Sequence, residues 1–236
     1  MESALKQLLE RLNKAFGDRL VSVVLYGSAA SGEHHEGFSD LNVLCVLQEV
    51  TTRELAASEP VFRWWREQDN PAPMLLSEHE VRTSTDCFAI EFHDIKAQHR
   101  LLHGKDVISD LVVDDAFYRA QVEHELRAKM LRLRQKASSA LADKDVLRRL
   151  LLDSISTFSV LFRHALRLHG VEGSTKKRDV VAEAQKAFGI DPQPFLKLLD
   201  VREERMKARE LEPEPLLDSY LKQITVVIDA VDRLER

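Results

Sequence analysis

The chain has 236 residues and a formal net charge of −5, and 44% of its residues are hydrophobic. This length fits one large or two small domains, and this apolar fraction suffices for a packed core. The net negative charge argues against a protein whose whole surface binds nucleic acid. No apolar run reaches membrane-spanning length and the start of the sequence lacks the apolar core of a signal peptide, so we expect a cytoplasmic protein without membrane contacts.

Both cysteines, Cys45 and Cys87, lie in apolar runs that resemble strands. Neither has the spacing of a metal-ligand set. We therefore expect two small core residues in a reducing compartment.

Helix and strand patterns alternate up to about residue 113. An N-terminal amphipathic helix leads into a predicted strand over residues 20–26, and a second strand is predicted over 40–48. The apolar positions of that helix have helical spacing: Leu5, Leu8, Leu9, Leu12 and Phe16. Thr51 and Glu54 form a capping box, which predicts the start of a helix that is interrupted or restarted at Pro60.

Two further strands are predicted in this first part. Residues 73–76 form a short apolar run, and Ser77 to Glu80 form a second capping box. Residues 87–92 predict a strand in which Ile90 and Phe92 share a face. The mixed pattern predicts an α+β fold with a small mixed sheet and helices against one of its faces.

Beyond residue 113 the apolar spacing is helical throughout. It predicts helices near residues 122–141, 146–165, 178–188, 194–208 and 216–234. Together they predict an all-helical bundle, so we expect a division into residues 1–113 and residues 114–236. Basic residues crowd the first bundle helix, and the acids among them indicate a solvated face. These residues are Arg127, Lys129, Arg132, Arg134 and Lys136.

The most informative segment lies between the first two predicted strands. Gly27 and Ser28 follow the first strand directly, and Asp40-Leu41-Asn42 opens the second strand after a polar loop. Gly27 lets the backbone turn tightly because it has no Cβ. Ser28 offers a hydroxyl and an N–H at a predicted helix start, where anions are favoured. Residues 40 and 42 are two apart on a strand, so their side chains share one face.

This segment resembles the signature of the DNA polymerase beta-like nucleotidyltransferase superfamily, in which Gly-Ser precedes an Asp-x-Asp pair by about a dozen positions. The helical second half resembles that of the aminoglycoside (kanamycin) nucleotidyltransferases. The resemblance implies transfer of a nucleoside monophosphate from an NTP, with ATP as the first candidate, to a hydroxyl acceptor. It also implies nucleotide contacts from Gly27, Ser28 and Ser39 and a Mg²⁺ site formed by Asp40 and Asn42.

Asn42 stands where the superfamily has a second aspartate. Its carbonyl oxygen can coordinate a metal ion, but it brings no negative charge. Mg²⁺ prefers carboxylate ligands, so the substitution weakens the Mg²⁺ site and predicts reduced activity.

The third carboxylate of the superfamily lies on a later strand. The best match is Glu91 on the predicted 87–92 strand, and the resemblance makes Glu91 and Asp40 the catalytic residues and metal ligands. Asp94 is the second candidate. The segment Arg100 to Gly104 resembles a turn that follows this region in minimal nucleotidyltransferases.

Other functions stay open beside transfer. A degenerate relative would bind nucleotide, or only a partner, without turnover, and the neutral Asn42 favours it. The helical half also resembles HEPN-type partners of minimal nucleotidyltransferases, which suggests a toxin–antitoxin component. The sequence does not identify the acceptor, disfavours a nucleic-acid partner and is compatible with a homodimer.

Overall fold

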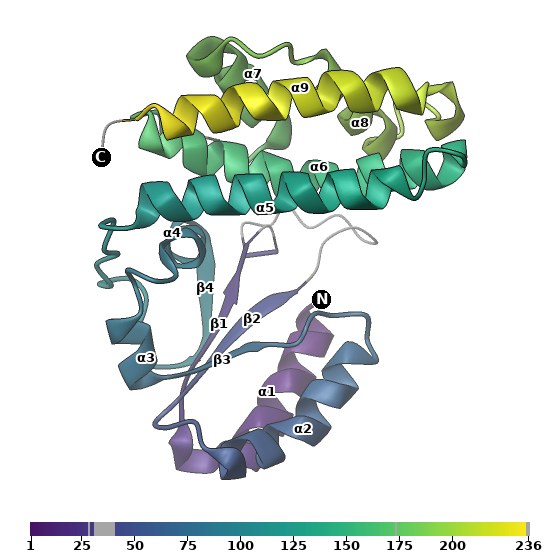
Figure 1. The fold of residues 1–236 in the computed structure, drawn as a ribbon. Helices are drawn as coiled ribbons and strands as arrows, with labels where there is room; N and C mark the ends of the chain where they lie inside the picture. Colours follow the sequence, from purple (N-terminus) through teal and green to yellow (C-terminus); the bar gives the residue numbers. More distant parts are fainter. Residues whose placement is uncertain (28, 31–40, 173, 235–236) are drawn as a thin grey trace. The chain divides into compact units, whose positions relative to one another are not determined.

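The computed structural model describes residues 1–27, 29–30, 41–172 and 174–234 of the chain. The chain divides into two compact units, residues 1–117 and residues 118–236. The first unit combines a four-stranded mixed sheet with helices, and the second is helical (Figure 1). This architecture confirms the expected fold class. No helix within the described residues is long and apolar enough to cross a membrane.

The sheet of the first unit contains strands β1 (Leu20–Tyr26), β2 (Asn42–Leu47), β3 (Met74–Ser77) and β4 (His99–Gly104), in the order β3-β2-β1-β4. β1 pairs antiparallel with both β2 and β4, whereas β2 pairs parallel with β3. The two central strands, β1 and β2, are almost wholly buried. The predicted strands over 20–26, 40–48 and 73–76 thus fall at or close to β1, β2 and β3.

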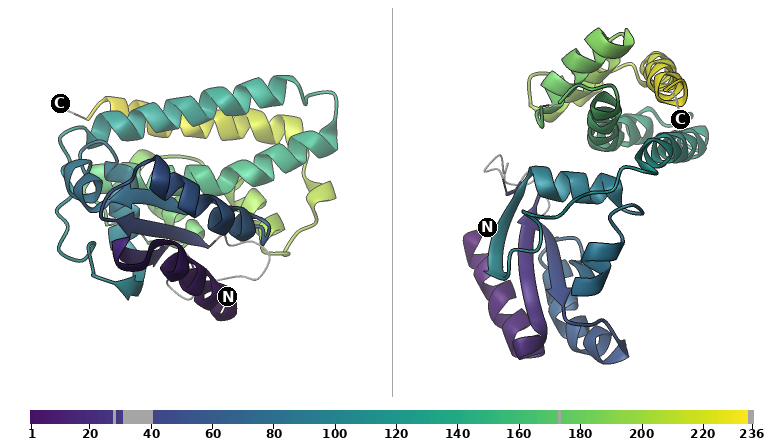
Figure 2. Two further views of the ribbon diagram at one scale, coloured as in Figure 1. Left: turned by 90° about the horizontal axis from the view of Figure 1, so that it is seen from below. Right: turned by 90° about the vertical axis from the view of Figure 1, so that its left-hand side faces the viewer.

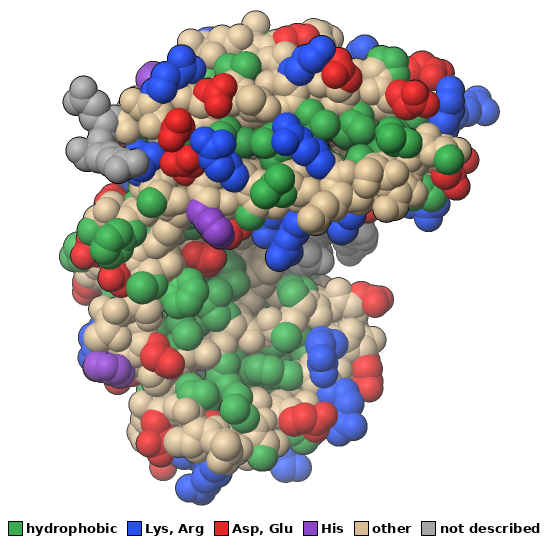
Figure 3. Space-filling view, viewed as in Figure 1, with side chains coloured by type: hydrophobic (Ala, Val, Ile, Leu, Met, Phe, Trp, Pro, Cys, Tyr) green, Lys and Arg blue, Asp and Glu red, His purple; other side chains and the backbone are tan. Residues whose placement is uncertain are grey.

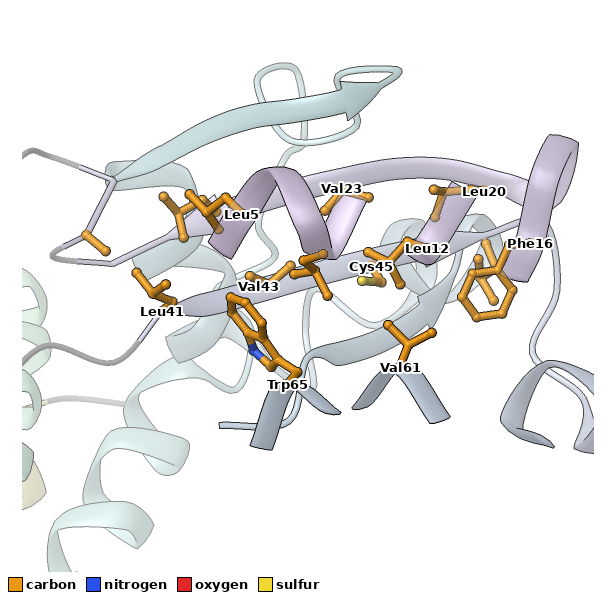
Figure 4. Packing of buried hydrophobic residues seen from close by; sticks show 14 residues of the cluster. Leu5, Leu12, Phe16, Leu20, Val23, Leu41, Val43, Cys45, Val61 and Trp65 are labelled. Carbon is orange, nitrogen blue, oxygen red and sulfur yellow. The ribbon is translucent and has the colours of Figure 1, made fainter. Parts of the chain in front are cut away.

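Helices α1 (Glu2–Phe16) and α2 (Thr52–Arg66) pack against one face of the sheet, and the 3₁₀ turn η1 (Gly17–Arg19) connects α1 to β1. Their apolar side chains close a core with alternate residues of β1 and β2 (Figure 4). The labelled members include Leu5, Leu12, Phe16, Leu20, Val23, Val43, Cys45, Val61 and Trp65. Cys45 is a buried core residue, as expected.

The opposite face of the sheet is covered as well. Helices α3 (Glu78–Thr83) and α4 (Ala89–Ala97) bury Val81, Phe92 and Ile95 against Val24 and Leu44. The expectation of helices on a single face is therefore wrong. The continuous apolar run of β2 already indicates burial on both faces, because a strand with one solvated face alternates polar and apolar residues.

The strand predicted over residues 87–92 is also wrong, because this segment begins helix α4. The buried residues Ala89, Phe92 and Ile95 recur every three positions, which is a helical spacing and not the alternation of a strand. Cys87 precedes this helix and is exposed, so it is not the predicted core residue. The strand lies at β4 instead, in a segment that resembled a turn.

Six helices, one of them a short 3₁₀ turn, are described in the second unit (Figure 2). They are α5 (Tyr118–Ser138), α6 (Lys144–Leu168), α7 (Lys177–Phe188), α8 (Gln193–Arg202), η2 (Ala208–Glu210) and α9 (Pro213–Asp232). Helix α6 packs against α5, α7, α8 and α9. Ring contacts among α6, α8 and α9 form an aromatic cluster of four residues: Phe158, Phe162, Phe195 and Tyr220.

Basic and acidic side chains alternate over the face of this unit seen in Figure 3. On α5, Arg127 pairs with Glu123 at 2.8 Å and Lys129 pairs with Glu125 at 3.3 Å. Such ion pairs between residues four apart on one helix are typical of its polar face.

Candidate functional site

Gly27 forms the turn at the end of β1. Its φ of +78° lies in the left-handed region, where a side chain would strain the backbone. Its N–H donates to the carbonyl oxygen of Gln98 at 3.0 Å, and its own carbonyl accepts from the N–H of Ala30 at 2.9 Å. The turn predicted from the sequence is therefore present at Gly27, and it is joined to the residue that precedes β4.

Asn42 lies beside this turn. It is the first residue of β2, and a Cβ added to Gly27 would lie 3.4 Å from the Asn42 Nδ2 atom. At this distance the Cβ would be in ordinary van der Waals contact with the amide side chain. The backbone of the turn and the polar group of Asn42 are therefore neighbours at one end of the sheet.

Three side chains form a row across that end of the sheet. In the strand registers, Tyr26 pairs with Asn42 on one side and with His99 on the other. Directly opposed residues of antiparallel strands project from the same face of the sheet. The face is that of Val24 and Leu44, which α4 covers. All three residues are half-buried.

Helix α4 brings two acids to the same place. Glu91 and Asp94 are three positions apart and therefore lie on one side of the helix. Burial raises the pKa of the Tyr26 phenol, and the negative charges of Glu91 and Asp94 raise that pKa further. Both carboxylates thus act on Tyr26, the middle residue of the row. Glu91 comes to the site from a helix and not from the predicted strand, and its role as a metal ligand stays a prediction.

The strands themselves carry no acid within the described part of the chain. None of β1 to β4 contains aspartate or glutamate. The parallel register of β2 with β3 places the segment Pro71 to Pro73 alongside the start of β2, and this segment is also without acids. Among the described residues, α4 brings Glu91 and Asp94 near this end and a turn after β4 brings Asp106, while residue 40 adds a carboxylate in the prediction.

The other predicted site residues, Ser28, Ser39 and Asp40, lie outside the described residues. Their convergence with Asn42 stays a prediction. Among the described residues, no group of three or more histidine, cysteine, aspartate or glutamate side chains could hold a metal ion. Asn42 and the α4 acids offer oxygen donors of the kind that Mg²⁺ takes, and the neutral Asn42 brings one charge fewer than the second aspartate of an Asp-x-Asp pair would.

A turn over residues 106–109 contacts His99, at one end of the row. The His99 Nδ1 atom lies 3.3 Å from the Lys96 carbonyl oxygen, and its Nε2 atom lies 3.4 Å from the Ser109 hydroxyl. That hydroxyl donates to Asp106 at 2.6 Å. Hydrogen bonds from the Ser109 hydroxyl and from the backbone N–H groups of Ser109 and Ile108 lower the pKa of Asp106 to about 2. Asp106 is therefore a charged anchor for this corner of the site.

Tyr26 and His99 are not among the site residues predicted from the sequence. Tyr26 is adjacent to Gly27 in the chain, which could have indicated a site residue. His99 has no such signal, because only the strand register brings it opposite Tyr26.

The family model of the nucleotidyltransferase domain matches residues 5–133. The chain belongs to this family. The match spans the whole sheet, the Gly27 turn and helix α4, and ends within α5. No curated protein sequence matches the chain.

Among solved structures, the fold of this nucleotidyltransferase-family chain is similar to that of a spectinomycin adenyltransferase from Enterococcus faecialis solved with ATP and spectinomycin. The TM-score is 0.63 at 12% identity, and the match covers 99% of this chain and 100% of that chain. A toxin–antitoxin structure with AMP-PNP matches with a TM-score of 0.31 at 16% identity, covering 43% of this chain and 74% of that one. The first likeness shows a shared fold.

Proposed function

We propose that this nucleotidyltransferase-family protein binds an NTP, ATP first, at the Gly27 end of the sheet and transfers its nucleoside monophosphate to a hydroxyl acceptor at a reduced rate. The observation that carries the proposal is that Gly27 and Asn42 are neighbours within the matched family domain. A Cβ added to Gly27 would lie 3.4 Å from the Asn42 Nδ2 atom. This nearness supports the proposal, because the turn to which we assign phosphate binding lies next to the position that holds a metal ligand in the superfamily.

Each residue has a distinct role in the proposal. Gly27 lets the turn come close to the triphosphate, Ser28 binds it through its backbone N–H and its hydroxyl, and Ser39 adds a further nucleotide contact. Asp40 and Glu91 hold Mg²⁺, with Asn42 as a neutral ligand. The ion would neutralise charge on the phosphates and on the leaving pyrophosphate when it is bound.

The neutral residue at position 42 is the reason for the reduced rate. Two unit charges about 4 Å apart attract by roughly 4 kcal/mol at an effective dielectric of about 20. Each loss of about 1.4 kcal/mol at the transition state slows the reaction tenfold. Even a part of the missing attraction therefore lowers turnover by orders of magnitude.

The acceptor is proposed by class only. The spectinomycin adenyltransferase has the same fold over the full length of both chains. A small polyhydroxylated acceptor is therefore the first class to assay. A protein hydroxyl is the second.

The alternative is nucleotide binding without turnover. It is supported by the absence of acids from the four described strands, together with Asn42. The toxin–antitoxin alternative has no observation in its favour among the described residues.

Calorimetry of ATP binding with and without Mg²⁺ tests the proposal. We compare the native protein with Asn42→Asp and Asp40→Ala. Asn42→Asp is expected to tighten Mg²⁺-dependent ATP binding by about 1–3 kcal/mol, after solvent reduces the raw Coulomb energy. Asp40→Ala is expected to remove the Mg²⁺ dependence.

The outcomes separate the candidates. Equal affinities in the three proteins would contradict a metal-dependent site. Mg²⁺-dependent binding without pyrophosphate release, even with polyhydroxylated acceptors present, would favour the binding-only alternative. Fast release by the native protein would contradict the reduced rate.

A further inference from the structure

A cavity of about 310 Å³ lies within the second unit, lined by residues of α8, of α9 and of the segment 206–212 that connects these helices. Helices α8 and α9 pack against each other (Figure 1). Sites for small molecules occupy about 300–1,000 Å³, so this cavity has the size of a small-ligand site. None of the residues to which we assign nucleotide transfer lines it.

The floor of the cavity is apolar. Pro194, Leu211 and Leu216 line it and are buried. Met206 and Pro215 complete the apolar lining. A ligand with a hydrocarbon part would gain free energy by covering this surface, because water would be released from it. The floor therefore favours an organic ligand over a bare ion.

The rim of the cavity is polar and mostly acidic. Asp191, Glu210 and Glu212 line it, with Lys197 as the one base among the lining residues. All four side chains are exposed. The second unit as a whole contains more basic than acidic residues, so this acidic rim is a local feature. Its charge favours a cationic ligand.

Two of these carboxylates are held by the backbone. Asp191 accepts a hydrogen bond at 3.0 Å from the N–H two positions later, and Glu210 accepts one at 3.3 Å from the N–H three positions earlier. Each bond uses one of the two carboxylate oxygens. Glu212 pairs with Lys144 at 3.1 Å, and both side chains are exposed, so a cationic group of a ligand can replace this weak contact.

We propose that this cavity binds an alkyl polyamine, whose ammonium groups donate to the carboxylates of the rim while its hydrocarbon chain covers the apolar floor. Hydrogen bonds between ammonium and carboxylate groups are about twice as strong as those between neutral groups. A metal ion would leave the floor uncovered, and a neutral apolar molecule would leave the acids without a cation. This site goes beyond nucleotide transfer and requires neither nucleotide nor Mg²⁺.

Calorimetry without nucleotide or Mg²⁺ tests the binding, with spermidine as the probe. Hexaamminecobalt(III) has the same charge as spermidine but no hydrocarbon chain, so it measures the attraction of the acids alone. We expect spermidine to bind at least about tenfold more tightly, because only spermidine covers the floor. Equal affinities would show a merely acidic surface and overturn the proposal. Absence of spermidine binding would overturn it as well.

A charge-removing double variant locates the binding. Asp191→Asn with Glu210→Gln removes two charges and keeps a side-chain oxygen to accept each backbone N–H. We expect spermidine affinity to fall about tenfold or more, because charge-assisted hydrogen bonds become neutral ones. Asp218→Asn with Asp229→Asn is the matched control, since these two acids of α9 are exposed and lie outside the cavity lining. An equal loss in both double variants would assign the effect to net charge and overturn the proposal.

Ser219→Phe tests the cavity without a change of charge. Ser219 lines the cavity from α9 and is half-buried, so a phenyl ring at this position would fill part of the space. We expect spermidine binding to be lost in a variant whose urea midpoint shows that it is folded. Native spermidine affinity in the folded variant would overturn the site, and if this variant does not fold, the charge variants decide. A native protein that binds spermidine but no nucleotide would support this site and contradict the proposed function.

Discussion

The backbone N–H of Gly27 donates to the carbonyl oxygen of Gln98 at 3.0 Å, which ties the turn after β1 to the start of β4. This bond fixes the turn in its left-handed conformation. It also sets the level at which Tyr26 meets His99 across the sheet. The conformation of the turn and the pairing of Tyr26 with His99 are therefore linked through this hydrogen bond.

Gly27→Ala is expected to cost about 1 kcal/mol of unfolding free energy, because a side chain is strained at a φ of +78°. It should also weaken nucleotide binding, since strain at this φ would distort the turn to which we assign the triphosphate. Urea unfolding and calorimetry measure the two effects. Gly170→Ala is the matched control, with a φ of +79° and no atom within 4 Å of the added Cβ. An equal loss of nucleotide affinity in both variants would contradict a specific role for Gly27.

Gly104→Ala should destabilise the protein much more strongly. The added Cβ would lie 2.1 Å from the backbone carbonyl oxygen of Val21, so β4 and β1 would have to separate. We expect a loss of more than about 2 kcal/mol, beyond the cost of the positive φ alone. Gly189→Ala has a similar φ of +73° and open space, and should lose only about 1 kcal/mol. Similar urea midpoints for the two variants would contradict this close approach.

Glu54 is expected to give a pH-dependent contribution to stability. It is nearly fully buried, completes the Thr51 capping box and forms an ion pair with Arg19. The hydrogen bond from Thr51 is the first cause that lowers the pKa of Glu54, and Arg19 lowers it further. A lowered folded-state pKa means that the stabilisation is complete above the unfolded value, about 4.3, and is lost as the pH falls through the folded value.

Glu54→Gln should therefore lower the urea midpoint at pH 7, and the difference from the native protein should shrink below about pH 4.3. Glu59→Gln is the control on the same helix. Both side chains of its ion pair with Arg63 are exposed, so this pair should contribute little to stability. A constant difference between native and Glu54→Gln proteins from pH 7 to pH 3 would contradict the assignment.

Ser22 offers a stabilising substitution. Its hydroxyl is fully buried in β1 and has no hydrogen-bond partner within the described residues. Burying an unpaired hydroxyl costs about 1–3 kcal/mol. Ser22→Ala should therefore raise the free energy of unfolding by about 1 kcal/mol. Ser159→Ala should not, because that buried hydroxyl donates to the Ile155 carbonyl at 2.8 Å. Loss of stability in Ser22→Ala would show that the hydroxyl is satisfied.

The central strands were predictable because their apolar runs are continuous and a glycine ends the first of them. β4 was not, since Leu101 and Leu102 are the whole of its apolar signal and its pairing with β1 is non-local. Helix α4 was misread because Ile90 and Phe92 fit a strand alternation over a short window. The turn at Gly27 was predicted from the glycine that ends the apolar run, whereas the nearness of Gly27 to Asn42 and the acids of α4 depend on tertiary packing that no local pattern specifies.

Glu91 lies in the first turn of α4, and the N-cap residue Phe88 gives that turn no side-chain hydrogen bond. An acid there interacts favourably with the positive end of the helix dipole. An uncapped helix end nevertheless frays more readily than buried strands such as β1 and β2 open. A ligand that binds only when this helix start is folded would oppose that fraying. If Glu91 takes part in nucleotide binding, the nucleotide would then order the helix start on which Glu91 lies. Amide hydrogen exchange would slow at this helix start, while exchange in the strands stays unchanged.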